Sequence, residues 1–155
     1  MLDKLDVSII KMFTEDPRIG VLEASRRLNV ARGTVRSRLA RLQETDVIRD
    51  FGPSINPEAI GFPVTAFVTA EIAQSDRDPS LISHLAAIPE VLEAQTITGP
   101  GDLLIRIVAR SNSDLQRVVD QIVNADAVLR TSTVIVLASQ VAYRTAPLIQ
   151  TTISE

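Results

Sequence analysis

The spacing of apolar residues changes near position 62, and this change constrains the fold more than any other feature of the chain. In residues 2–13 and the segments that follow, apolar side chains recur at the spacing of an amphipathic helix. Beyond Phe62, short segments rich in β-branched residues, such as residues 64–72, are typical of strands. The sequence therefore predicts two domains of different class, residues 1–62 and residues 63–155.

The first domain is predicted to be a winged helix-turn-helix. Asn29 follows the second helical segment, and asparagine is one of the few residues besides glycine that accept a left-handed turn. Three helices with a tight turn between the second and third, followed by a strand, are typical of this DNA-binding fold. The expected helices are residues 2–13, 21–30 and 31–46, and the expected strand is residues 47–51.

The second domain is predicted to have the order βαββαβ, a ferredoxin-like arrangement in which both helices cover one face of an antiparallel sheet. The expected strands are residues 64–72, 91–98, 103–110 and 128–141, and the expected helices are residues 78–88 and 111–123. The other face of the sheet is uncovered within one chain, although the strands carry apolar residues on both sides. We therefore expect an α+β protein in which two sheets pack together in a dimer.

Arginine is concentrated on the third predicted helix, although the whole chain has a formal net charge of −3. No acid stands between Glu23 and Glu44, and six of the sixteen basic residues lie there. Residues 1–63 carry a net charge of +1 and residues 64–155 a net charge of −4. Clustered basic charge on one helix is typical of phosphate binding. The acidic second half should point away from DNA.

At about 100° per residue, Val35, Leu39 and Leu42 share one face of this helix and should be buried. Small residues on the opposite face let the backbone approach base edges, while arginines reach guanine or phosphate. A merely solvated arginine face is the alternative, and Arg38, beside the apolar face, fits a structural ion pair equally well. The candidate DNA-binding residues are Arg26, Arg27, Arg32, Gly33, Thr34, Arg36, Ser37, Arg38 and Arg41.

Composition excludes several other classes of protein. The chain has no cysteine, which excludes disulfides and thiolate chemistry, and its four Phe and single Tyr provide few platforms for stacking single-stranded bases. No apolar run approaches the roughly 18 residues of a membrane helix, and the acidic start does not resemble a secretion signal. We expect a cytoplasmic, nucleoid-associated protein with no cofactor, no metal and no membrane partner.

Several segments, in the right order, resemble the Lrp/AsnC family of transcription regulators (feast/famine regulatory proteins). The opening LDKLDVSII is similar to the family's LDxxDxxIL start, and TVRSRLARLQETDVI resembles its recognition helix and the turn into the wing. DPRIGVLEASRRLNV is similar to its second-helix segment and INPEAIG to its linker. The resemblance covers nearly the whole chain. It implies a homodimer, often built into octamers, that binds double-stranded DNA and responds to a small effector, commonly an amino acid.

The resemblance also implies where the effector binds. The family's Gly-x-x-Asp loop matches Gly99 and Asp102, and the family places hydroxyl groups on the last strand. Glycine backbone N–H groups can hold a carboxylate, and Asp102 could accept from an ammonium group. A simple hairpin turn and ordinary β propensity are the alternatives. The candidate effector-binding residues are Thr98, Gly99, Pro100, Gly101, Asp102, Thr131 and Thr133.

Two other functions remain open at this point. Some relatives resemble the family in fold yet are enzymes that decarboxylate tetrapyrroles through histidines, but this chain has one histidine, His84, and a lone helical histidine is rarely a catalytic base. We expect no enzymatic activity and no catalytic residue. A DNA-architectural protein without a ligand is the other alternative, and a steep salt dependence with little sequence preference would favour it.

Overall fold

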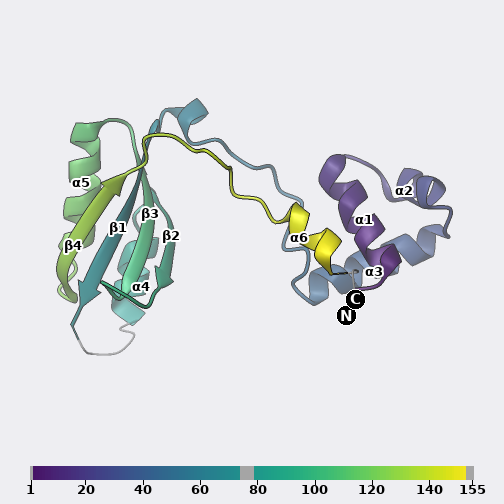
Figure 1. The fold of residues 1–155 in the computed structure, drawn as a ribbon, viewed down its shortest axis with the longest axis horizontal. Helices are drawn as coiled ribbons and strands as arrows, with labels where there is room; N and C mark the ends of the chain where they lie inside the picture. The colour runs from purple at the N-terminus through teal and green to yellow at the C-terminus, as the bar shows by residue number, and fades with distance from the viewer. Residues whose placement is uncertain (1, 74–78, 153–155) are drawn as a thin grey trace. The chain divides into compact units, whose positions relative to one another are not determined.

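The computed structural model describes residues 2–73 and 79–152, which form two compact units. We call the residues up to Ser54 and from Val141 onward the helical unit, and Ile55–Gln140 the sheet unit. The sequence predicts that the C-terminal segment belongs to the second domain, whereas in the structure this segment groups with the helical unit (Figure 1). Within the described ranges, every helix falls short of the length and apolar content needed to cross a membrane.

The helical unit is a helix-turn-helix built from α1 (Lys4–Glu15), α2 (Val21–Leu28) and α3 (Arg32–Glu44). Asn29 ends α2 in the left-handed conformation, with φ of 52°, which confirms the predicted tight turn. The side chains of Val35, Leu39 and Leu42 are buried in the core of this unit, as the helical spacing predicted. The opposite face of α3 is therefore left on the surface.

The strand predicted for residues 47–51 is wrong. The backbone N–H groups of Val47 and Ile48 both donate to the carbonyl of Leu42, at 2.9 Å, and so close the end of α3 instead of forming a ladder. The ring of Phe51 then packs on Phe13 of α1, with centroids 5.8 Å apart. Side chains rather than strand pairing hold this segment, and the described part of the helical unit contains no strand with which it could pair.

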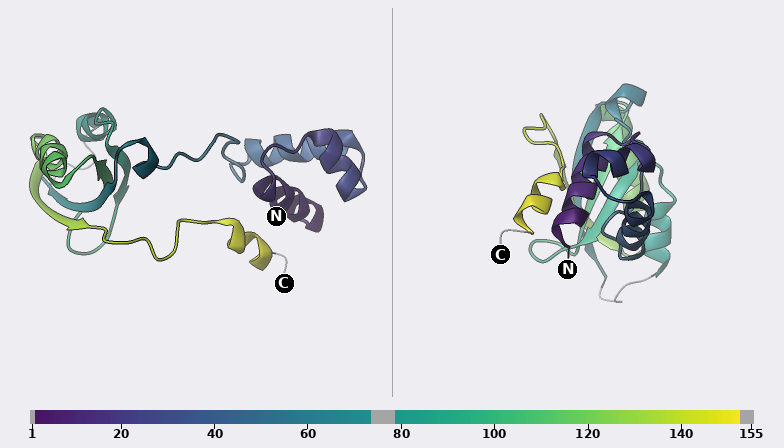
Figure 2. Two further views of the ribbon diagram at one scale, coloured as in Figure 1. Left: turned by 90° about the horizontal axis from the view of Figure 1, so that it is seen from above. Right: turned by 90° about the vertical axis from the view of Figure 1, so that its right-hand side faces the viewer.

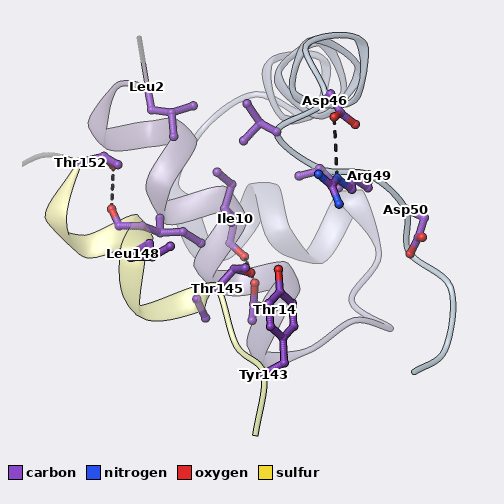
Figure 3. Close-up of a pocket in the computed structure, with 14 residues that line it drawn as sticks. Leu2, Ile10, Thr14, Asp46, Arg49, Asp50, Tyr143, Thr145, Leu148 and Thr152 are labelled. Carbon is purple, nitrogen blue, oxygen red and sulfur yellow. Dashed lines mark hydrogen bonds and ion pairs between the residues drawn. The ribbon is translucent and has the colours of Figure 1, made fainter. Parts of the chain in front are cut away.

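A short helix at the C-terminus, α6 (Ala146–Thr151), was not predicted and packs against α1. Ile149 contacts the core of the helical unit. Figure 3 shows the C-terminal segment beside α1, where Tyr143 and Leu148 line the same cavity as Ile10 and Thr14 of α1. A cavity of about 540 Å³ lies between α1, residues 46–50 and this segment. The C-terminal segment is therefore part of the helical unit.

The sheet unit contains β1 (Val64–Ile72), α4 (Pro79–Ala86), β2 (Val91–Thr96), β3 (Leu103–Ala109), α5 (Asn112–Val123) and β4 (Val128–Ile135), preceded by the short 3-10 helix η1 (Glu58–Ile60). The strands are antiparallel in the order β2-β3-β1-β4, and this confirms the ferredoxin-like prediction. Helices α4 and α5 lie on the same face of the sheet (Figure 2, left).

Strand β4 is shorter than the predicted strand 128–141 because β1, the strand with which it pairs, does not extend beyond Val64. The last backbone bond runs from the N–H of Val136 to the carbonyl of Thr65, at 2.9 Å, and β1 begins only one residue earlier. The core lies between the helices and one sheet face, where Val68, Ile105 and Ile107 are fully buried. Because successive side chains of a strand alternate between the two faces, Phe67, Thr69 and Arg106 lie on the opposite face, which we call the open face.

Candidate DNA interface and effector pocket

The six clustered arginines fall into two groups in the structure. Arg26 on α2 and Arg32 and Arg36 on α3 are exposed and form no ion pair with any described residue. Arg27 is paired with Glu23 one turn earlier on α2, at 2.9 Å. Arg38 and Arg41 are paired with acids of α1. Three guanidinium groups are thus free to bind an external anion.

Asp6 is the acid that fixes α3 against α1. Its carboxylate is fully buried and accepts from Arg38, at 3.0 Å, and from Arg41, at 2.5 Å. Asp3 also pairs with Arg38. The two aspartates form a capping box, in which each carboxylate accepts from the other residue's backbone N–H. The LDKLD start therefore has a structural role, because it both begins α1 and anchors the arginine helix.

Burial alone raises the pKa of Asp6, but hydrogen bonds from the Asp3 backbone and from the guanidinium groups of Arg41 and Arg38 outweigh it. The net effect is a pKa below the usual value of 3.8. The pKa of Asp3 is lowered as well, mainly by the hydrogen bond from the Asp6 N–H and then by Arg38. Both carboxylates therefore stay ionised at neutral pH and keep the arginines in place.

The surface between the free arginines is made of small residues. Gly33 and Ser37 are exposed, one turn apart on α3, and a Cβ atom at Gly33 would meet nothing within 4 Å. Ala31 provides no side-chain cap for α3, so the first-turn N–H donors have no side-chain partner there. Arg26 lines the same shallow surface depression as Ala31. The start of α3 thus combines backbone donors, a small-residue face and free guanidinium groups.

The predicted effector loop is tied to the end of β1. The carboxylate of Asp102 accepts from the N–H of Ile72, at 2.8 Å, and the N–H of Asp102 donates to the carbonyl of Ala70, at 2.9 Å. Gly99 has a φ of 127°, a backbone conformation that residues with a side chain rarely adopt. Gly101 lies so close to Thr69 that a Cβ atom at position 101 would overlap the methyl group of Thr69. Asp102 therefore shapes the turn in this structure.

A pocket of about 240 Å³ lies on the open face beside this loop. Its lining includes two of the predicted effector residues, Pro100 and Thr131, and four residues that sequence reasoning missed: Thr69, Glu71, Arg130 and Ser132. The missed residues come from β1 and β4, which only strand pairing brings together. Alternation along those strands puts Thr69 and Glu71 on one face, but the register with β4 was not readable from the sequence.

The two predicted threonines lie on the other side of β4. Thr131 pairs with Ala70 and Thr133 with Val68, both of which face the helices. Successive side chains of a strand point to opposite faces, so Arg130 and Ser132 are the β4 residues on the open face. Thr131 lies between these two residues and still lines the pocket. Thr133, two residues further along β4, is not among the residues that line it.

His84 joins the two helices of the sheet unit, because its Nε2 lies 2.7 Å from the backbone carbonyl of Gln121 on α5. The ring is half-buried in this position. Within residues 2–73 and 79–152, no three histidine or acidic side chains are grouped so as to hold a metal ion.

Two family models match this chain. The AsnC-type helix-turn-helix domain matches residues 2–43, and the Lrp/AsnC ligand binding domain matches residues 65–147. The first match covers α1, α2 and all but the last residue of α3. The second covers all but the first residue of the four-stranded sheet, both of its helices and the start of the C-terminal segment.

Individual relatives agree with these matches. The HTH-type transcriptional regulator FL11 of Pyrococcus furiosus is 30% identical over 137 residues, covering 88% of this chain and 90% of its own. The structure of E. coli AsnC has a TM-score of 0.86 at 25% identity, over 95% of this chain and 99% of that one. The feast or famine regulatory protein from M. tuberculosis, solved with L-methionine, has a TM-score of 0.83 at 25% identity, over 94% and 98% of the two chains. The chain belongs to the Lrp/AsnC family and is a transcriptional regulator with a helix-turn-helix and a ligand-binding domain.

Proposed function

We propose that the protein is a sequence-specific regulator that binds duplex DNA through α3, and that an amino acid bound to the sheet unit modulates this binding. The observation that carries the DNA-binding part is a set of three exposed arginines that pair with no described residue, Arg26, Arg32 and Arg36, around the small residues of α3. Arginine's rigid fork of donors suits both guanine edges and phosphates. Arg38 and Arg41 contribute mainly by orienting the helix.

The first test is fluorescence anisotropy on duplex DNA from upstream of the protein's own gene, at fixed salt, against random duplex competitor. We expect Arg36→Ala to weaken binding about tenfold, because it removes one base or phosphate contact. Arg144→Ala, which removes an exposed arginine of the C-terminal segment, should leave the affinity unchanged. Equal losses in both variants would contradict the assignment of the recognition face, and equal affinity for random DNA would contradict sequence specificity.

We also propose that two copies associate through the open face of the sheet. Arg106 lies at the centre of this face, opposite Phe67 of β1, and its Nε is buried without an acceptor among the described residues. Buried donors without a partner are rare in native proteins and call for an acceptor. The helices cover only the other face of the sheet. A second copy would both cover the apolar residues and supply a partner for Arg106.

Phe67→Asp is expected to abolish this association, because it places a charge in the middle of the apolar contact. Light scattering after gel filtration should give at least twice the chain mass of 16.9 kDa for the wild type and the single mass for the variant. Ile82→Asp, at an exposed position of α4 on the helical side, is the control and should leave the mass unchanged. A wild-type protein with the single mass would refute the proposed dimer.

A further inference from the structure

The C-terminal helix α6 covers a face of α1 that the core of the helical unit does not reach. Val7 of α1 is only 7% exposed, although it lies outside the cluster of buried side chains that forms this core. Val7 lines a cavity of about 290 Å³ together with Ala146, Pro147 and Ile149 of α6. Figure 3 shows the C-terminal segment alongside α1. The burial of this face of α1 therefore depends on α6.

Helix α6 is held to α1 by few contacts. It has only six residues, no side chain caps its first turn, and isolated helices of this length are unstable in water. It contains no charged residue, so no ion pair can fix it to α1. Ile149 is its one side chain among those packed against the core, and it borders both the 290 Å³ cavity and the larger one of about 540 Å³. Empty space beside a side chain weakens its packing, so the docking of α6 depends mainly on Ile149.

Helix α1 lies between α6 and the arginine helix α3. Asp6, the residue before Val7, is fully buried and accepts from Arg38 and Arg41 of α3. At about 100° per residue, the side chains of Asp6 and Val7 point in different directions, one to α3 and the other to α6. Ile10, one turn after Asp6, belongs to the core and also lines the larger cavity beside α6. A change at α6 can therefore reach α3 through a single helix.

We propose that α6 is a detachable strap, whose docking on α1 holds α3 in the orientation that binds DNA and whose release weakens DNA binding. The chain runs from β4 of the sheet unit through residues 137–145, which form neither helix nor strand, into α6 of the helical unit. A rearrangement of β4 is thus passed along the chain to the helix that covers α1. This inference rests on the proposed function, since it concerns DNA binding through α3.

The docking is tested by the reactivity of a single thiol in the full-length protein. Because the chain contains no cysteine, Val7→Cys introduces the only thiol, beneath α6. Adding Ile149→Asp should make this thiol react with a disulfide reagent at least about tenfold faster, because the charge shifts α6 to the released state. Adding Leu148→Asp instead is the matched control, because Leu148 is already 63% exposed, and should leave the rate unchanged.

The link to DNA is tested by fluorescence anisotropy with duplex from upstream of the protein's own gene. Ile149→Asp should weaken binding about tenfold, whereas Leu148→Asp, which adds the same charge one residue away, should bind like the wild type. Docking and DNA must favour each other by one factor, so saturating duplex should slow the reaction of the thiol at position 7 by about tenfold too. Ile149→Ala should change both quantities in the same directions by smaller factors, and it replaces Ile149→Asp if circular dichroism shows that the aspartate unfolds the unit.

The possible failures can be told apart. If the thiol at position 7 reacts at the same rate with and without the substitution of Ile149, α6 does not cover α1 and the strap is wrong. If the thiol reacts faster but DNA affinity is unchanged, or if Leu148→Asp weakens binding as much as Ile149→Asp, docking does not control α3. In these cases the strap is refuted and the proposed regulator stands. If the wild type shows no preference for the duplex over random DNA and duplex does not slow the reaction, both proposals fail.

Discussion

Asp6→Ala is expected to destabilise the helical unit by about 3 kcal/mol, because breaking a buried ion pair leaves uncompensated charge. The loss should lie at the low end of the usual range because the side chains of Arg38 and Arg41 are 29% and 47% exposed and regain some hydration. For a unit of this size the midpoint of thermal unfolding should fall by about 12 °C or more. Calorimetry of the full chain measures this directly.

DNA binding should fall with Asp6→Ala as well, since α3 loses the contacts that fix it against α1. Glu44→Ala, which removes an exposed acid of α3 that pairs with no described residue, is the control and should change the midpoint little. Asp6→Asn keeps the size of the side chain but not its charge, so its unfolding midpoint should lie between those of Asp6→Ala and Glu44→Ala. A midpoint for Asp6→Ala equal to that of the control would show that the buried carboxylate does not hold the unit together.

The same carboxylates make the helical unit sensitive to acid. The pKa values of Asp3 and Asp6 are lowered in the folded state, so the stability that they provide is present above the unfolded value of about 4. It is lost as the pH falls through the folded values. The midpoint of thermal unfolding of the wild type should therefore fall steeply as the pH is lowered below about 4, and the midpoint of Asp6→Asn should fall less.

The features of the fold that could be predicted are those that depend on the local spacing of apolar residues and on turn residues. The buried face of α3, the turn at Asn29 and the order of strands and helices all follow from apolar spacing and turn chemistry within a short window. The false strand at residues 47–51 arose because β-branched residues there look like a strand in isolation, and only the missing partner strand decides against it.

The roles of individual charges could not be predicted in the same way, because they depend on partners far apart in the sequence. In the sequence Arg41 looks like a DNA-binding residue, and Arg38 fits a phosphate contact and a structural ion pair equally well. The structure decides for the ion pair by placing Asp6, more than thirty residues away, between the two arginines. One signal was available, since Asp6 lies four residues from both Leu2 and Ile10 and so interrupts an apolar stripe. Glu71 and Arg130 line one pocket because the register of β1 with β4 places them opposite each other, and this register cannot be read from the sequence.

Gly101→Ala should destabilise the sheet unit by about 1–3 kcal/mol, because the added methyl group would overlap the side chain of Thr69. It would also lie 3.3 Å from the carbonyl oxygen of Ala70, on the backbone that anchors the loop. Moving that loop displaces Pro100 from the pocket on the open face, and under the proposed function amino-acid binding should weaken together with stability. Calorimetry and isothermal titration with amino acids measure the two effects separately.

The cause can be isolated with a second substitution. Thr69→Ser removes the overlapping methyl group, so the double variant should recover part of the lost stability, leaving only the contact with Ala70. Gly33→Ala is the opposite control, because open space surrounds that position on α3 and alanine should raise helix stability by up to about 1 kcal/mol. If Thr69→Ser rescues nothing, the close approach of Gly101 to β1 is not what requires a glycine in this loop. If it rescues stability and amino-acid binding together, the turn after β2 and the pocket on the open face are one structure.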